Sequence, residues 1–193
     1  MEGDRMSFIT EKPIEKVLFK DRLYRITPAF DVVLDIQNLY KEDELSAIDK
    51  LDMALNMLGM SKFRLKLMSL DDKSELLEEM YKQCINVKQR PEVGKQGPPV
   101  LDFDEDAEYI YASFMSDYGI DLLEQRGRLS WRKFVYLFQG LTDKAKIKEV
   151  MKIRGMELPK ANRHNQKEIQ NLIEAKSYYA LPVRGGGGQA GLD

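Results

Sequence analysis

The chain has 193 residues, of which 43% are hydrophobic and 32% are charged, and its formal net charge is −2. A chain of this length can bury roughly two-thirds of its unfolded surface, so it needs neither disulfides nor a metal to fold. The balanced charge gives no electrostatic reason to expect nucleic acid or an anionic membrane as a partner.

The single cysteine, Cys84, leaves no internal disulfide and fits a reducing cytoplasm. We expect no signal peptide, because residues 1–10 mix charges and lack an apolar core. No apolar run approaches the roughly 18–20 residues that a membrane span requires. We therefore expect a protein of the cytoplasm that does not enter a membrane.

Two short apolar runs, 17–19 and 23–26, predict an N-terminal β-hairpin. Residues 20–22 between them lack the Asn-Gly or Asp-Gly pair that favours a tight hairpin turn. The hairpin prediction therefore rests on the two apolar runs and not on the turn.

Thr27-Pro28 predicts the start of the first helix, because threonine can cap a helix and proline suits its first position. A second helix is expected over about 43–58, with Gly59 as its terminator. Residues 60–70 are ambiguous, because apolar and basic residues alternate there.

The clearest helical pattern comes next, with apolar residues spaced along one face at a period of 3.6. These residues are Leu76, Leu77, Met80, Tyr81, Cys84 and Ile85. Asp71, Asp72 and Glu75 lie near the start of this helix, where the helix dipole favours acidic side chains.

The pattern breaks at 88–101, where prolines and glycines exclude a helix or a central strand. Four more helices are expected after the break: three begin near 102, 130 and 162, and a short one follows the break that Gly140 and Thr142 mark. Their apolar faces comprise Ala107, Ile110, Tyr111, Phe114 and Tyr118; Trp131, Phe134, Val135, Phe138 and Leu141; Ile147, Val150 and Met151; and Ile169, Leu172, Ile173 and Tyr179. Gly119, Ser130 and Asn162 are the expected terminator and caps.

These elements predict a mainly α, multi-helix fold with two helical subdomains and a small N-terminal β-hairpin. The expected parts are a disordered N-terminus at 1–13, the hairpin and first helical subdomain at 14–87, a linker or loop at 88–101, a second helical subdomain at 102–181 and a disordered glycine-rich tail at 182–193.

The acidic cluster at 102–108 is the obvious candidate for a metal site, since hard cations bind converging carboxylates. Its spacing does not match a calcium loop, and consecutive helical residues fan around the axis. We interpret the cluster as an acidic helix start that is stabilised by the dipole, and we expect no metal and no cofactor.

Catalytic candidates are few in this sequence. His164 is the single histidine, and Cys84 falls on the apolar face of a predicted helix, so a Cys–His nucleophile pair is disfavoured against a buried structural thiol. The basic residues between 144 and 154 alternate with acids and favour a solvated helix face over a nucleic-acid site. We expect no enzyme activity and no catalytic residue.

Protein binding is the remaining hypothesis. Tyr109 and Tyr136 fall off the apolar stripes, as interface tyrosines do, and Trp131 belongs to the same aromatic group. Met57 and Met60 suit an adaptable apolar groove. For each of these residues, filling the core is the competing interpretation.

The second half of the chain resembles the phage gene-product-fifteen family of siphophages and prophages. The resemblance is carried by 102–114, 118–122, 129–134, 137–141, 150–154 and 174–181, and more loosely by 32–35. It implies a gene between those of the major tail protein and the tape-measure protein.

Proteins encoded there are similar to tail assembly chaperones, which coat the tape-measure protein until tail-tube subunits replace them. The resemblance therefore implies the tape-measure protein and other tail assembly proteins as partners, self-association into a homo-oligomer, and action in the host bacterial cytoplasm. The alternatives are a structural tail or neck completion protein of the virion, a metal-dependent enzyme using Asp102, Asp104 and Asp106, and a nucleic-acid binder.

Overall fold

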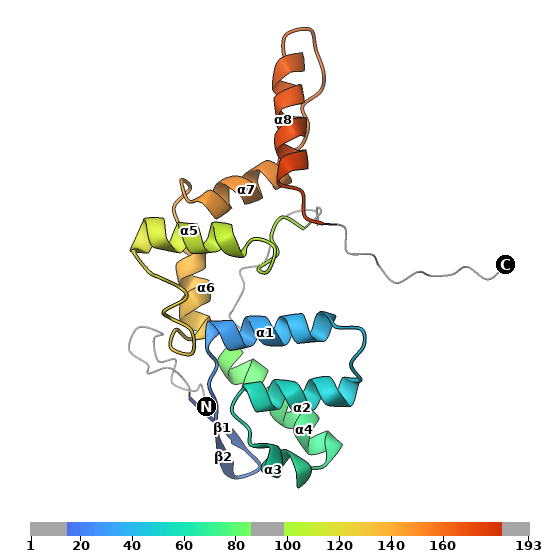
Figure 1. The fold of residues 1–193 in the computed structure, drawn as a ribbon, viewed down its shortest axis with the longest axis vertical. Helices are drawn as coiled ribbons and strands as arrows, with labels where there is room; N and C mark the ends of the chain where they lie inside the picture. The colour runs from blue at the N-terminus through green and yellow to red at the C-terminus, as the bar shows by residue number, and fades with distance from the viewer. Residues whose placement is uncertain (1–14, 86–98, 183–193) are drawn as a thin grey trace, which may run out of the picture. The chain divides into compact units, whose positions relative to one another are not determined.

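The computed structural model describes residues 15–85 and 99–182, and Figure 1 traces their fold. The predictions made for 1–13, for 88–98 within the expected linker and for 183–193 lie outside the described residues. The elements are β1 (Lys16–Phe19), β2 (Arg22–Arg25), α1 (Phe30–Lys41), α2 (Ala47–Met57), α3 (Lys62–Lys66), α4 (Leu70–Met80), the π-helical turn η1 (Tyr81–Ile85), α5 (Ala107–Tyr118), α6 (Trp131–Gln139), α7 (Lys146–Gly155) and α8 (Gln166–Tyr178). The prediction of a mainly helical fold with an N-terminal hairpin is confirmed.

The chain forms two compact units that are not contiguous in sequence. The first contains the described residues up to 85 together with 121–140, and the second contains 99–120 with 141–182. This differs from the predicted division, which kept 102–181 together. Helix α6 joins the first unit because Phe134 stacks on Phe30 of α1, with ring centroids 5.0 Å apart.

The hairpin of the first unit turns over two residues. Strands β1 and β2 pair in antiparallel register, with Phe19 opposite Arg22. Lys20 and Asp21 both have positive φ, 46° and 59°, which is the backbone of a type I′ turn. Positive φ strains most side chains and is tolerated best by glycine, asparagine and aspartate, so Lys20 is the less usual residue in this turn. Lys20 also reaches α4, with its ammonium 2.5 Å from Asp72 and 2.7 Å from Glu75.

The start of α1 was predicted incorrectly. The helix begins at Phe30, and Ala29 stands at the cap position without a side-chain hydrogen bond. Ala29 is instead extended and forms an isolated antiparallel bridge with Ser130, and its two preceding residues make long-range backbone bonds. The Thr27 N–H donates to the Leu58 carbonyl at 3.0 Å, and the Trp131 N–H donates to the Pro28 carbonyl at 2.8 Å. The Pro28 carbonyl is thus taken by Trp131 and cannot accept from the N–H four residues later, as a helix starting at Pro28 would require.

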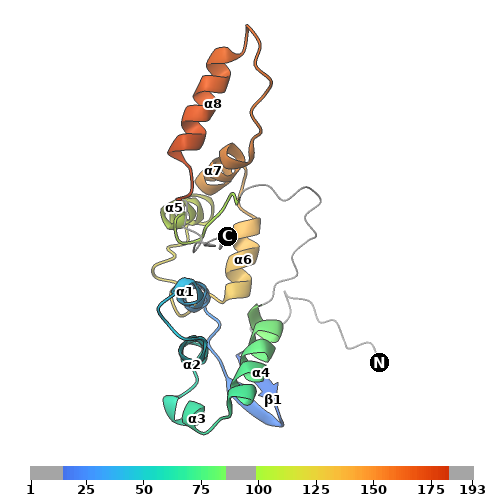
Figure 2. The same ribbon diagram turned by 90° about the vertical axis from the view of Figure 1, so that its right-hand side faces the viewer.

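The apolar faces of α1, α2, α4 and α6 form the core of the first unit. Figure 2 shows α1 and α2 nearly end-on, with α4 alongside α2. The buried residues of these helices include Val33, Ile36, Leu51, Ala54, Leu55, Leu76, Met80 and Phe134. The predicted stripe beyond Met80 continues as η1, where Cys84 and Ile85 are buried and the turn packs against α6.

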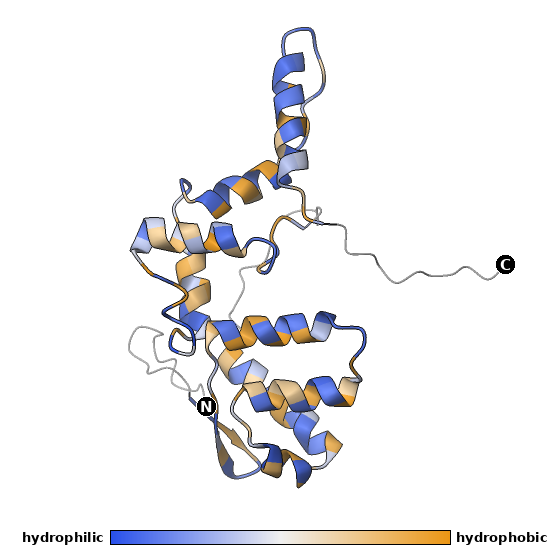
Figure 3. Cartoon of the chain, viewed as in Figure 1, coloured by the Kyte–Doolittle hydropathy of each residue, from blue (hydrophilic) through white to orange (hydrophobic). Residues whose placement is uncertain are grey.

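The second unit has a smaller core between α5 and α7. Its buried apolar side chains are Ile110, Phe114, Leu141, Ala145, Ile147 and Val150. Gly119 ends α5 in the left-handed conformation, with φ 64°, as predicted. Helix α8 contributes no buried residue, and Figure 3 shows it as mostly hydrophilic with separated hydrophobic positions. The predicted Asn162 cap is not the cap position, because the helix starts after Asn165.

Candidate protein-binding site

The five residues proposed for protein binding have different surroundings. Trp131 and Met60 are only 7% and 3% exposed, so both serve the core of the first unit. Tyr109 is half-buried and meets Tyr179 edge-to-face, with ring centroids 5.9 Å apart. Tyr136 and Met57 are exposed on the first unit. Trp131 and Met60 therefore fill the core, whereas Met57 is exposed and can contact a partner.

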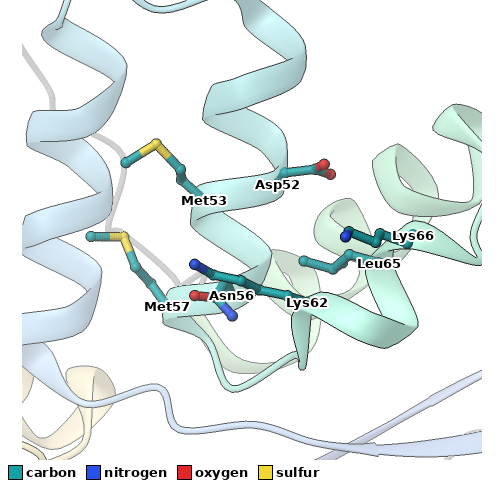
Figure 4. Close-up of a pocket in the computed structure, with 7 residues that line it drawn as sticks. All are labelled: Asp52, Met53, Asn56, Met57, Lys62, Leu65 and Lys66. Carbon is teal, nitrogen blue, oxygen red and sulfur yellow. The ribbon is translucent and has the colours of Figure 1, made fainter.

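Met57 belongs to a pocket between α2 and α3, which Figure 4 shows in close-up. The pocket encloses about 360 Å³ and is lined by Asp52, Met53, Asn56, Met57, Lys62, Leu65 and Lys66. Met53 and Met57 lie one helical turn apart and extend their thioethers in the same direction from α2. Their exposed fractions are 43% and 36%, so a partner can reach both side chains.

Local sequence signals set the angle between the two pocket helices. Gly59 ends α2 with φ +109°, and the Met60 N–H donates back to the Leu55 carbonyl at 3.0 Å. The Asn56 side-chain amide donates to the Met60 carbonyl at 2.7 Å and fixes the same turn. Ser61 then caps α3 by accepting from the Arg64 N–H. Gly59 is thus the helix terminator that the sequence predicted.

The floor and rim of the pocket differ in chemistry. Leu65 is buried and forms apolar floor, whereas Lys62 and Lys66 are exposed and stand on the rim. Asp52 points away from the two methionines in Figure 4. Its carboxylate oxygens lie 2.7 and 3.0 Å from the Lys73 ammonium, which neutralises it.

Helix α3 extends this surface beyond the pocket. Phe63 and Leu67, one turn apart, are each 73% exposed. With the residues that the structure describes, Lys62, Arg64 and Lys66 form no ion pair. Residues 60–70 gave no clear element from their sequence, and the alternation of apolar and basic residues there belongs to this surface.

The acidic cluster has a different role from the one predicted. Asp106 is fully buried, and both of its carboxylate oxygens accept hydrogen bonds of 2.7 Å from the Arg154 guanidinium. Arg154 also donates to the carbonyls of Val100 and Tyr179. Asp106 does stand at the start of α5, as predicted, but its carboxylate is also half of a buried bidentate ion pair in the second unit, which the sequence did not predict.

Asp102 acts locally instead. The Asp102 carboxylate accepts from the Asp104 and Glu105 N–H groups. The Asp102 N–H in turn donates to Asp106 at 3.0 Å. Among residues 15–85 and 99–182, no group of three or more acidic, histidine or cysteine side chains is arranged to hold a metal ion.

Cys84 and His164 lie in chemically different surroundings. Cys84 is buried in the first unit, and burial raises the pKa of its thiol to about 11, a rise that the nearby Arg132 partly opposes. The thiol is thus protonated at neutral pH and packs as a small apolar group. His164 is exposed in the turn before α8, where its backbone N–H donates to the side-chain oxygen of Asn162.

Comparison with protein-family models matches residues 9–181 to the family described as "Bacteriophage Gp15 protein". The chain belongs to the bacteriophage Gp15 family. The match covers most of the sequence and includes both units, so the pocket and the buried ion pair lie inside it. No curated protein and no solved structure matched the chain.

The family places the chain among bacteriophage proteins. Over the described parts of the chain, none of the helices is both long and apolar enough to cross a bilayer.

Proposed function

We propose that this Gp15-family protein is a tail assembly chaperone that binds the tape-measure protein in the host cytoplasm during tail morphogenesis. The observation that supports it best is the α2–α3 pocket, where Met53 and Met57 are exposed beside a buried leucine. Methionine is unbranched and polarisable, so a methionine-lined groove adapts to different apolar side chains. An amphipathic client helix binds such a groove through residues spaced three and four apart.

The proposed mechanism is reversible coverage of the client. Each copy binds weakly, because tail-tube subunits must later replace it on the tape-measure protein. Many copies on one long client bind multivalently, so the whole coat is more stable than any single contact. Self-association of neighbouring copies would add to this effect.

The protein acts by binding in this proposal, without catalysis. Two candidate reactive side chains already have structural roles, since Cys84 is a protonated core thiol and Asp106 is paired with Arg154. The exposed groups of the pocket include thioethers and ammonium groups, which suit recognition of another polypeptide.

Co-expression with the tape-measure protein of the same phage tests the proposal. We expect the wild-type chain to raise the soluble fraction of the tape-measure protein and to co-purify with it. The variant Met53→Gln/Met57→Gln should lose both effects. The matched control, Met115→Gln/Met156→Gln, changes two exposed methionines of the second unit and should retain them. Failure of the wild-type chain to bind, or full binding by the pocket variant, would contradict the proposal.

Mass spectrometry of purified phage particles separates the chaperone from a structural tail or neck completion protein. A chaperone is released before the tail is complete, so the chain should be absent from finished particles. Its presence at a stoichiometry similar to that of other tail proteins would favour the structural alternative.

A further inference from the structure

The α2–α3 pocket carries a charge pattern as well as an apolar lining. Building on the proposed function, we infer that the pocket selects client helices that place carboxylates beside their apolar stripe. The segment Lys62–Lys66 reads KFRLK, so the helix that walls the pocket has three basic side chains and no acidic one. In a protein with a net charge of −2, this concentration of positive charge is local.

The one acidic lining residue does not cancel this charge. Both carboxylate oxygens of Asp52 lie within 3.0 Å of the Lys73 ammonium on α4, and Asp52 points away from the methionines. Lys73 is largely buried, so this pair is a fixed part of the first unit. The rim that faces a ligand is therefore positive, through Lys62 and Lys66.

The spacing of the rim lysines suits a helical partner. Lys62 and Lys66 are four residues apart on one helix, so their side chains occupy the same face. Carboxylates three or four residues apart on a client helix present the same repeat. An apolar client side chain between them would then enter the pocket that Met53, Met57 and Leu65 line.

The concave shape favours a peptide over a lipid surface. Basic and aromatic residues also bind anionic bilayers, but a bilayer-binding helix lies in the membrane interface and buries one continuous apolar face. Here the lysines border a hollow of about 360 Å³ between two helices, which fits a protruding side chain. An acidic amphipathic helix is thus the occupant that uses both the charge and the hollow.

Synthetic helical peptides with one apolar stripe test the inference by fluorescence anisotropy on the full-length protein. The first peptide carries glutamates beside the stripe and the second carries lysines at the same positions. We expect the glutamate peptide to bind more tightly, with a preference that declines as salt is added. Equal affinities, or tighter binding of the lysine peptide, would overturn the inference.

Substitutions of the rim lysines test whether they cause the tighter binding of the glutamate peptide. Lys62→Gln/Lys66→Gln should weaken binding of the glutamate peptide by about five-fold, as expected for two exposed ion pairs. The control Lys160→Gln/Lys167→Gln makes the same charge change at exposed positions of the second unit and should bind as the wild type does. The reversal Lys62→Glu/Lys66→Glu should bind the lysine peptide better, an outcome that unfolding cannot produce.

The remaining measurements separate this inference from its rivals and from the proposed function. Co-sedimentation with phosphatidylglycerol vesicles that is lost in the Lys62→Gln/Lys66→Gln variant would overturn the peptide assignment in favour of a lipid surface. If the wild-type chain and this variant solubilise the tape-measure protein equally, the charge inference fails while the proposed function stands. If the peptide preference is present but the wild-type chain does not bind the tape-measure protein, the proposed function fails alone.

Discussion

The interiors of the two units differ in the kinds of side chains that they bury. The first buries apolar faces of α1, α2, α4 and α6, with a stacked Phe30–Phe134 pair and the fully buried Ile36 and Leu55 among them. The second has few buried apolar residues and places the Asp106–Arg154 ion pair beside them. Truncating one apolar side chain removes only part of the stabilisation of an apolar core. Removing one partner of a buried ion pair leaves the other charge buried without compensation.

The difference extends to how the outer elements are attached. In the first unit, the hairpin is held by the hydrogen bonds between its strands and by the ion pairs of Lys20 with Asp72 and Glu75 of α4. In the second unit, α8 buries no residue and is attached to α7 by polar contacts of Lys176, which donates to the carbonyls of Ile153, Arg154 and Met156. The second unit should therefore open locally at lower free energy than the first.

The largest expected effect is on the buried ion pair. Asp106→Ala leaves the Arg154 guanidinium buried without its carboxylate, and it should lower the free energy of unfolding by about 3–5 kcal/mol. Urea unfolding followed by circular dichroism measures the loss, and hydrogen exchange should locate it in α5 and α7. The control Glu108→Gln removes an exposed acid from the first turn of α5 and should cost less than about 1 kcal/mol. Equal losses in both variants would show that the pair is not the critical contact.

The next effect concerns reactivity in the first unit. Burial raises the pKa of Cys84 from 9.0 to about 11, so the thiolate fraction near pH 8 should fall about a hundred-fold below that of an ordinary thiol. Labelling with a disulfide reagent should be slow in the native protein and fast in urea. Because the folded-state pKa is raised, the native rate should increase as the pH rises towards 11. Rapid native labelling at pH 8 would mean that this core is open.

A smaller effect is expected at the attachment of α8. Lys176→Ala removes the hydrogen bonds to the end of α7 and should reduce the protection of α8 amides by about 1–2 kcal/mol. Hydrogen exchange read out by mass spectrometry resolves α8 from α5 and α7. Lys167→Ala on the same helix is the control, since it removes an exposed lysine from the first turn. Unchanged exchange in α8 would place its attachment elsewhere.

The smallest effect has the opposite sign. Asp21→Gly puts a residue without a side chain at the φ of 59° in the hairpin turn, and it should stabilise the first unit by about 0.5 kcal/mol. The urea midpoint from Trp131 fluorescence reports this change, since Trp131 belongs to the first unit. A lower midpoint would indicate that the turn is not limited by backbone strain.

The sequence by itself determined the class of fold and most element types. The 3.6-residue stripe from Leu76 to Ile85, the terminators Gly59 and Gly119, and the apolar runs of the hairpin all express local physics that neighbouring residues decide. The family resemblance also followed from linear motifs, and the family match over residues 9–181 bears it out. Met57 was proposed as a partner contact because methionines recur between residues 53 and 68; its side chain is exposed, and the contact itself stays a prediction.

Only the tertiary structure decided which residues meet across long separations. The backbone bonds of Thr27 and Pro28 to Leu58 and Trp131 shifted the start of α1. The pairing of Asp106 with Arg154 gave an acid predicted only for a helix start a buried partner 48 residues away. Local propensity carries no information about such partners, because the free energy of burying a charge depends on what the fold brings beside it. The sequence likewise could not show that Lys62 and Lys66 border a pocket, because the pocket exists only where α3 lies beside α2.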